Sequence, residues 1–318
     1  MNAILPSPPH TAPPPADRSP ALVYLASLSS PRSQRVQAAA LQTVIAVLTD
    51  TASTPPFDTV VRFPWWALRY QHTQVVRARL VASGRAPATV NRTLAALRGV
   101  LKACKKLGLM SAADCDSAAD LPPVRGQRLP AGRDIPPHEL RAMLLSCYED
   151  GRKGVRDLAA LGLLAATGIR RAEFEALDLA DFNPETGALR VQGKGRKERT
   201  VYVVNTARAL LDRWLDQRGS QPGPLFLAMT KGGRLTARRM SAAAAYKMVR
   251  DRAAACGLEL ATPHDLRRTF IGNMLDAGVD AVTVTAITGH ASVEMLKRYD
   301  RRPERAKRAA QASIDLPI

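Results

Sequence analysis

Four short segments in the second half of the chain carry side chains suited to the chemistry of a phosphate ester. In order they are T-G-I-R-R-A-E with Arg170, G-K-G-R-K-E-R with Lys194, H-D-L-R with His264 and Arg267, and T-G-H with His290, followed nine positions later by Tyr299. Arginine binds phosphate oxygens through a fork that stays charged, histidine titrates near neutrality, and a tyrosine hydroxyl can act as a nucleophile. Together these types could bind a phosphate, attack it and protonate a leaving group.

Spacing indicates which of these side chains lie together. Arg170 and Glu173 are three residues apart, as are His264 and Arg267, so each pair shares one face of a helix. The glycines of G-K-G-R-K-E-R let the backbone turn and approach a ligand closely. Each segment alone is typical of a surface pair, a turn or an amphipathic tail. Their order and spacing together favour a single functional site.

This order resembles that of the phage integrase, or tyrosine recombinase, family. T-G-I-R-R-A-E is similar to the family's first-arginine box, G-K-G-R-K-E-R to the hairpin with its catalytic lysine, H-D-L-R-R-T-F to its H-x-L-R box, and T-G-H to its L-G-H. The resemblance spans Pro137 to about Arg302 and extends more loosely to A-T-V-N-R-T-L-A-A-L-R-G-V-L. There are two departures: Ile169 replaces a leucine, and Tyr299 lacks the family's preceding Thr-Thr pair and following histidine.

The resemblance implies cleavage and rejoining of DNA through a covalent intermediate. Tyr299 would attack the scissile phosphate to give a 3′-phosphotyrosine and a free 5′-hydroxyl. Arg170 and Arg267 would hold the non-bridging oxygens, and Lys194 would protonate the leaving oxygen. No metal, ATP or other cofactor is expected, because these cations supply the positive charge and the phosphotyrosine conserves the energy of the cleaved bond.

Other polar residues of the segments receive supporting roles from the same resemblance. His264 and His290 would hydrogen-bond the phosphate and help to move protons, and Glu173 would brace the arginines. The remaining basic residues are expected to make structural or DNA-backbone contacts: Arg171, Lys197, Arg199 and Arg268.

Composition and charge agree with a polyanionic partner. Among 318 residues, 46 are Lys or Arg and 28 are Asp or Glu, which gives a net charge of +18. Such an excess favours nucleic acid, with a merely soluble basic surface as the alternative. We expect no signal peptide, because the N-terminus lacks a charged segment followed by an apolar one. We expect no membrane span, because no apolar run reaches about 18 residues. The four cysteines form no C-x-x-C pair and predict reduced thiols in a cytoplasmic protein.

Pattern along the chain predicts two domains and a mainly α fold. We expect a disordered Pro-rich leader over 1–20, an all-helical core-binding domain over 21–119, a linker over 120–134, a catalytic domain over 135–310 and a tail over 311–318. The catalytic domain is predicted as α+β, with a small β-sheet among helices. Its expected elements are helices at Glu139–Tyr148 and Asp157–Ala166, a hairpin at Ala188–Val204, a strand candidate at Leu225–Leu227 and mainly helix beyond.

The clearest helix of the first domain runs from Pro87 to Leu107, with Gly108 after its end. Its apolar face comprises Val90, Leu94, Leu97, Leu101, Cys104 and Leu107. Its other faces carry the candidate DNA-binding residues Arg92, Arg98, Lys102, Lys105 and Lys106. A solvated charged face is the alternative reading. Trp65 and Trp66 are predicted to be core residues rather than base-stacking ones.

The expected partner is double-stranded DNA at core recombination sites, bound by a homotetramer that joins two sites. The resemblance further implies that the tail after Arg301 docks on a neighbouring protomer, with a frayed terminus as the alternative. No additional arm-binding domain is visible, which favours simple core sites such as those of a mobile element. Two other functions stay open: type IB topoisomerase-like relaxation, and a catalytically silent DNA-binding accessory protein.

Overall fold

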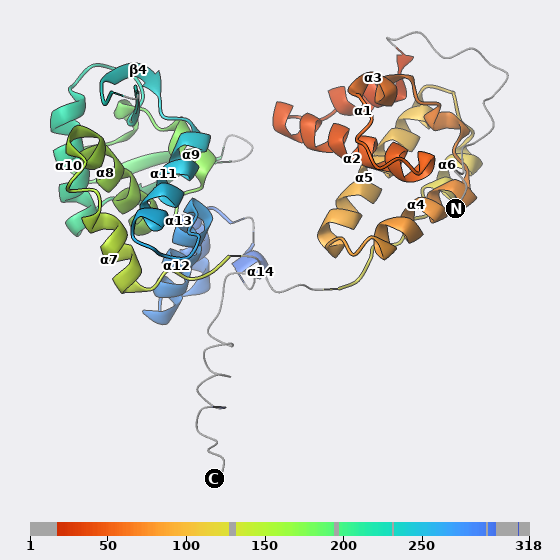
Figure 1. The fold of residues 1–318 in the computed structure, drawn as a ribbon. Coiled ribbons are helices and arrows are strands. Elements are labelled where there is room, and N and C mark those ends of the chain that lie inside the picture. The colour runs from red at the N-terminus through yellow and green to blue at the C-terminus, as the bar shows by residue number, and fades with distance from the viewer. Residues whose placement is uncertain are drawn as a thin grey trace. The chain divides into compact units, whose positions relative to one another are not determined.

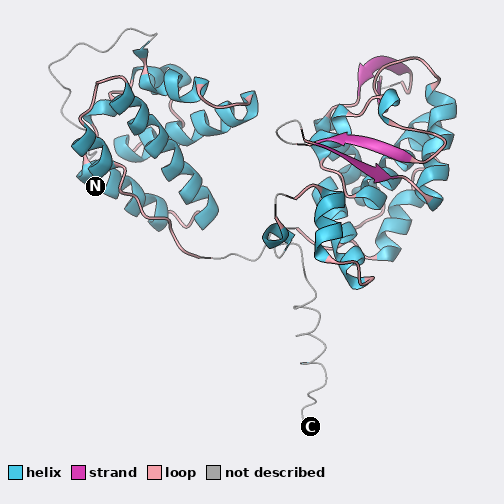
Figure 2. Ribbon diagram, turned by 180° about the vertical axis from the view of Figure 1, so that it is seen from behind, coloured by secondary structure: helices cyan, strands magenta, loops and turns pink. Residues whose placement is uncertain are grey.

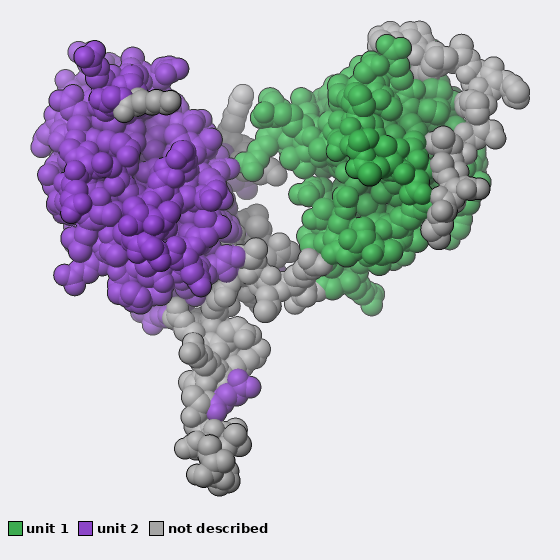
Figure 3. Space-filling view, viewed as in Figure 1, with its two compact units in different colours: residues 1–129 green, residues 130–318 purple. Residues whose placement is uncertain are grey.

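The chain divides into two compact units, residues 1–129 and 130–318, in the computed structural model (Figures 1 and 3). The structure describes residues 18–126, 132–193, 197–230, 232–290, 292–296 and 311. Each unit buries its own hydrophobic core. Most of the expected leader lies outside the described residues, but Ser19 and Pro20 at its end are already buried in unit 1.

Unit 1 is helical throughout its described part. Its elements are α1 (Pro20–Ala26), α2 (Pro31–Thr49), α3 (Phe57–Arg62), the 3-10 turn η2 (Trp65–Ala67), α4 (Tyr70–Ala82), α5 (Pro87–Lys106) and α6 (Ala112–Ala118). Helix α5 confirms the predicted helix and contacts α1, α2, α4, α6 and η2. Trp65 and Trp66 are buried in this core, as predicted, and Trp65 Nε1 donates to the Val60 carbonyl oxygen at 2.9 Å.

Unit 2 is a helical body with two small antiparallel hairpins on its surface (Figure 2). Its helices are α7 (Pro137–Leu145), α8 (Gly151–Thr167), α9 (Arg171–Ala176), η3 (Leu179–Asp181), α10 (Asn205–Arg218), α11 (Ala242–Ala255), α12 (Pro263–Asp276), α13 (Ala281–Thr288) and α14 (Val293–Leu296). Its strands are β1 (Ala188–Gln192), β2 (Glu198–Tyr202), β3 (Leu227–Met229) and β4 (Leu235–Arg239). Helix α8 is buried along nearly its whole length and packs against α10 and α12. The predicted α+β fold is confirmed.

Of the strands in the two hairpins, β1 and β2 were predicted correctly from the sequence, and β3 and β4 were not. The β1–β2 hairpin lies where it was predicted, with Val191 opposite Arg199. The strand candidate Leu225–Leu227 is wrong by two residues, because Leu225 and Phe226 are buried core contacts that precede β3. Strand β4 was missed, since its sequence L-T-A-R-R is basic and shows no regular apolar alternation.

Both described ends of the expected linker over 120–134 are hydrogen-bonded to the adjacent unit. Near its start, the Asp120, Leu121 and Pro122 carbonyl oxygens accept hydrogen bonds from unit 1 side chains, and Val124 pairs with Asn91. Near its end, Arg133 is hydrogen-bonded within unit 2. Only residues 127–131 of the segment lie outside the described residues.

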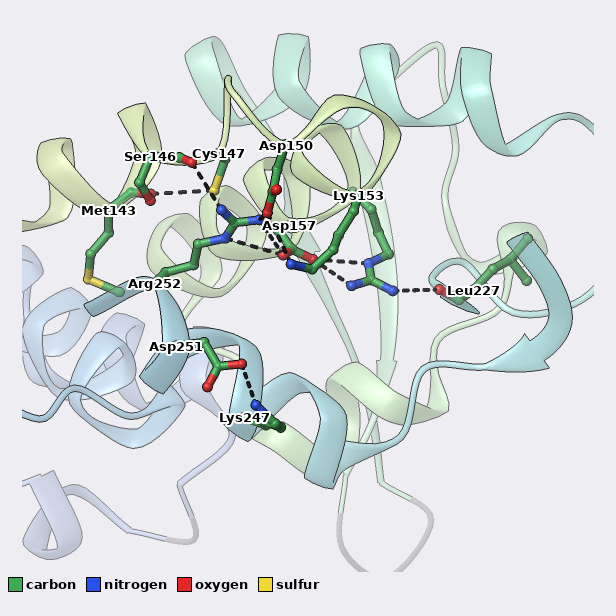
Figure 4. Close-up of polar contacts among 11 residues, drawn as sticks. Met143, Ser146, Cys147, Asp150, Lys153, Asp157, Leu227, Lys247, Asp251 and Arg252 are labelled. Carbon is green, nitrogen blue, oxygen red and sulfur yellow. Dashed lines mark hydrogen bonds and ion pairs between the residues drawn. The ribbon is translucent and has the colours of Figure 1, made fainter. Parts of the chain in front are cut away.

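A buried ionic cluster ties together the helices of unit 2 (Figure 4). The Asp157 carboxylate on α8 is 1% exposed. It accepts hydrogen bonds from Arg156 at 2.7 and 3.0 Å and from Arg252 of α11 at 2.7 and 3.2 Å. Arg252 also donates to the Ser146 carbonyl oxygen and to Asp150, just beyond α7. The Asp157 carboxylate therefore pairs with two buried guanidinium groups and joins α8 to α11, while Arg252 extends the cluster to Ser146 and Asp150 beyond α7.

Removal of this carboxylate should destabilise the protein strongly. We expect Asp157→Ala to lower the free energy of unfolding by about 3 kcal/mol, because two arginines lose their buried counter-ion. The matched control is Asp251→Ala, which breaks the exposed Lys247–Asp251 pair and should cost less than about 1 kcal/mol. Urea unfolding followed by circular dichroism measures both values. Equal losses in the two variants would contradict the role of the cluster.

Candidate active site

Arg170 occupies the junction between α8 and α9. Helix α8 is followed by its C-cap residue Gly168, which has a φ of +58° and packs so tightly that an added Cβ would lie 2.4 Å from the Phe270 ring. Arg170 precedes α9 and forms a reciprocal cap with Glu173. Its main-chain N–H donates to Glu173 Oε2, and its Nη1 donates to Glu173 Oε1, both at 2.8 Å. The predicted pairing of these two residues is confirmed.

Arg267 lies in the second turn of α12 and is only 2% exposed. Its Nη1 donates to the Gly168 carbonyl oxygen at 2.5 Å, and its Nη2 donates to the Thr288 carbonyl oxygen at 2.8 Å. The guanidinium group therefore bridges the end of α8 and the end of α13. A buried charge in this position is stabilised by the carbonyl dipoles at the two helix ends.

The carbonyl oxygens at the end of α13 also accept hydrogen bonds from Arg170. Arg170 donates from Nη1 to the Thr288 carbonyl oxygen at 3.3 Å and from Nη2 to the Gly289 carbonyl oxygen at 2.7 Å. Gly289 has a φ of +66°, and an added Cβ would lie 2.9 Å from the Arg199 guanidinium group. Glycine is therefore required here for both the backbone turn and the close approach of Arg199.

Glu173 is the buried acceptor at the centre of the site. Besides Arg170, it accepts hydrogen bonds from Arg199 Nη1 at 3.1 Å and from Arg199 Nη2 at 2.8 Å. Arg199 also donates from Nε to the Ile287 carbonyl oxygen at 2.7 Å. Burial alone would raise the pKa of Glu173, but the hydrogen bonds from Arg199 and Arg170 outweigh burial and lower it. Glu173 is thus an ionised brace.

The surroundings of His290 define its protonation state. The Thr288 hydroxyl donates to the Val284 carbonyl oxygen at 2.6 Å, so it accepts from His290 Nδ1 at 2.7 Å. His290 Nε2 lies 3.1 Å from Arg267 Nη2, which can only donate. The imidazole is therefore neutral, with its proton on Nδ1. Burial, followed by the charges of Arg267, Arg170 and Arg199, lowers the pKa of His290 to about 4.

His264 lies in the first turn of α12 and reaches the surface. Partial burial, followed by the charges of Arg268 and Arg267, lowers its pKa below the ordinary value. The two histidines of the site are therefore both neutral at pH 7, one exposed and one enclosed.

The structure brings together four of the six predicted catalytic residues, which are Arg170, His264, Arg267 and His290. The other two, Lys194 and Tyr299, lie outside the described residues. The base of the lysine hairpin nevertheless reaches the site, because a Cβ atom at Gly193 would lie 3.7 Å from Glu173 Oε1. From the sequence, Arg199 was predicted only to make a structural or DNA-backbone contact. Its pairing with Glu173 joins residues 26 positions apart, and no periodicity in the sequence signals it.

The predicted DNA-binding face of α5 divides into two groups. Arg92, Lys102 and Lys106 are exposed. Arg98 donates to the Leu121 carbonyl oxygen at 2.7 Å, and Lys105 forms an ion pair with Asp116 at 3.1 Å. The last two therefore have structural partners within unit 1.

No group of three or more His, Cys, Asp or Glu side chains within the described residues could hold a metal ion. No helix in the part of the chain that the structure describes is long and apolar enough to cross a membrane.

Comparison with known proteins assigns the chain to the tyrosine class of recombinases. The Phage integrase family model matches residues 133–305, which is more than half of the chain. A tyrosine recombinase XerC of Shewanella amazonensis is 32% identical over 239 residues, covering 74% of this chain and 77% of the relative. A XerC of Pelobacter propionicus is 35% identical over 210 residues, covering 65% of this chain and 67% of the relative. The chain belongs to the phage integrase family, and it is a site-specific DNA recombinase.

Solved structures share the fold at low sequence identity. A lambda integrase dimer bound to a core site aligns with a TM-score of 0.65 over 89% of this chain and 75% of that chain, at 12% identity. XerH recombinase bound to a palindromic substrate aligns with a TM-score of 0.59 over 76% of this chain and 70% of that chain, at 22% identity. The mostly helical architecture with small sheets is therefore common to these proteins.

The low pKa of His290 makes stability depend on pH. A histidine that is buried in its neutral form stabilises the fold above its unfolded pKa of about 6.5, and this contribution is lost as pH falls toward the folded value of about 4. We expect wild type to lose about 1 to 2 kcal/mol more than His290→Gln between pH 6.5 and 4, after allowance for solvent screening. Urea unfolding at a series of pH values measures the difference. Parallel curves for the two proteins would exclude a buried neutral His290.

Proposed function

We propose that Tyr299 attacks the scissile phosphate of a DNA core site and forms a 3′-phosphotyrosine. The observation that carries this proposal is the convergence of Arg170, Arg267 and His290 at the carbonyl end of α13. These groups come from three segments that are far apart in the sequence, and they leave an excess of positive charge beside one buried carboxylate. A doubly esterified phosphate with developing negative charge is the ligand that such a cluster suits.

Arg170 and Arg267 contribute differently to phosphate binding. The Arg170 side chain is 37% exposed. Its hydrogen bonds within the described part of the chain run through Nη1 and Nη2, so Nε can donate to a phosphate oxygen without loss of the Glu173 pair. Arg267 is buried and already donates to two carbonyl oxygens. It therefore supplies charge beneath the phosphate and orients the carbonyl groups that hold Arg170.

Proton transfer follows from the state of the histidines. In the free protein, His290 accepts from Arg267 and has a low pKa. A bound phosphodiester brings negative charge next to the imidazole, which raises this pKa and favours a form that donates to the phosphate. His264 is exposed at the same site and can contact the DNA backbone. Lys194, on the hairpin whose base adjoins Glu173, would protonate the leaving 5′ oxygen.

The two units would have different roles in a DNA-bound assembly. Unit 1 would be the core-binding domain, with α5 facing DNA, and unit 2 the catalytic domain. A homotetramer would hold two core sites and exchange strands in two steps. The lambda integrase and XerH structures contain DNA sites and support a DNA-bound assembly. The lambda integrase structure contains a dimer. The tail after Arg301 would dock on a neighbouring protomer.

The nucleophile is tested with a nicked duplex that carries the core site. Wild type should give a protein–DNA adduct that survives denaturing electrophoresis, and Tyr299→Phe should give none while binding the same duplex. Glu173→Gln should reduce the adduct rate about a hundredfold, because Arg170 loses its buried anchor. Absence of an adduct from wild type, despite tight binding, would favour the accessory reading. Transfer of the trapped strand to a second duplex, rather than simple rejoining, separates recombination from topoisomerase-like relaxation.

The role of α5 is tested by the salt dependence of DNA binding. Replacement of both Lys102 and Lys106 by Ala should reduce the slope of log affinity against log salt by about two, because each phosphate contact releases about one counter-ion. Lys105→Ala is the control on the same helix, since its charge is already paired with Asp116. Fluorescence anisotropy at several salt concentrations gives the slopes. An unchanged slope in the double variant would assign this face to solvent.

A further inference from the structure

The chain that enters unit 2 is hydrogen-bonded to the first turns of α12. The Arg133 main-chain N–H donates to Asp265 Oδ1 at 3.0 Å, and the Ile135 N–H donates to Thr269 Oγ1 at 2.8 Å. The Thr269 hydroxyl in turn donates to the Asp265 carbonyl oxygen at 2.9 Å. The entering segment therefore follows the helix that carries two of the candidate catalytic residues.

The Arg133 side chain fixes this segment from the other side. Its Nη2 donates to Glu139 Oε2 at 2.5 Å and to the Glu259 carbonyl oxygen at 3.0 Å. Its Nε lies 3.4 Å from the Leu260 carbonyl oxygen. The loop before α12 and the first turn of α7 are thus joined to one residue of the entering chain, which leaves this residue little freedom to move independently of α12.

Asp265 is the point where the entering chain meets the start of α12. One carboxylate oxygen, Oδ2, caps the helix by accepting from the Thr262 N–H at 3.0 Å and from the Thr262 hydroxyl at 2.6 Å. The other oxygen, Oδ1, faces the entering chain and accepts from Arg133. Asp265 is buried, directly follows His264 and stands two residues before Arg267. A displacement of its carboxylate would therefore move the turn that carries both.

Gly132 packs against the same carboxylate oxygen that accepts from Arg133. It has a φ of +92°, and an added Cβ would lie 2.2 Å from Asp265 Oδ1. No side chain fits in that space unless the carboxylate moves. Gly132 is therefore required by the packing against Asp265 as well as by its backbone conformation.

We propose that Asp265 is a positioning residue, and that residues 132–135 are a latch through which the interdomain segment sets the orientation of His264 and Arg267. The other end of this segment is docked on unit 1 through Asp120–Val124. The Cα atoms of Gly126 and Gly132 are six residue steps apart along the chain and can be separated by at most about 22 Å. Movement of unit 1 on DNA beyond that reach would pull on Gly132 and, through Asp265, on α12. This inference rests on the proposed catalytic roles of His264 and Arg267.

The test compares two glycine variants of the full chain. Gly132→Ala introduces both backbone strain and a clash with Asp265. Gly278→Ala, in the turn after α12, introduces similar strain at a φ of +81° but meets no atom within 4 Å. We expect Gly132→Ala to slow adduct formation on the nicked duplex at least about tenfold, with DNA affinity changed less than about twofold. Gly278→Ala should match wild type in both.

A second readout does not depend on cleavage. The titration of His264, followed by NMR, should shift in Gly132→Ala and stay unchanged in Gly278→Ala, because only the first moves the Arg267 and Arg268 charges relative to the imidazole. The latch would be overturned if Gly132→Ala formed the adduct at the wild-type rate and its His264 titrated as in wild type. If wild type itself gives no adduct, the proposed function fails, and the titration still decides the latch.

A third variant covers the case in which Gly132→Ala does not fold. Thr269→Val removes the acceptor of the Ile135 N–H and keeps the side-chain shape, while the Thr262–Asp265 cap stays intact. It should slow adduct formation and shift the His264 titration in the same way. A folded Thr269→Val protein with wild-type values in both measurements would equally overturn the latch.

Discussion

The carbonyl oxygens at the end of α13 are the acceptors on which the site depends. The last carbonyl groups of a helix have no partner within the helix and carry partial negative charge. Here the Thr288 and Gly289 oxygens accept from Arg170 and Arg267, which come from two other segments. Guanidinium groups would repel one another if they were brought together without such acceptors. The helix end therefore makes the cluster of cations possible and also fixes its geometry.

The balance of charge at this cluster explains its chemical state. Glu173 is the carboxylate that Arg170 and Arg199 share, and their hydrogen bonds keep its pKa low in spite of its burial. Burial, together with the excess of positive charge that remains, lowers the pKa of His290. A phosphodiester would reverse that effect by supplying the missing anion. Under the proposed function, the protonation state of the site would be coupled to substrate binding through the whole cluster rather than through one residue.

The segment between the two units is hydrogen-bonded to unit 1 at its start and to unit 2 at its end. A sequence rich in proline, glycine and arginine indicates a linker, but Val124 is held by Asn91 of unit 1, and Arg133 is held by Asp265 of unit 2. Backbone N–H and carbonyl groups that lack a regular element find side-chain partners here. The hydrogen bonds of Arg133 and Ile135 thereby attach the start of unit 2 to α12, the helix that carries His264 and Arg267.

The sequence by itself determined the class of the protein, its mainly helical character and the residue types of the proposed site. The period of apolar residues in α5, the glycines that end α8 and α13, and the order of the arginine and histidine segments are all local features that a single chain displays. Strand β4 was hidden because its basic residues show no alternation. Tertiary structure alone decided that Arg199 pairs with Glu173, that His290 is neutral with its proton on Nδ1, and that Arg133 contacts Asp265. Hydrogen bonds between residues far apart in sequence depend on how the helix ends are arranged in space. Spacing along the chain does not predict that arrangement.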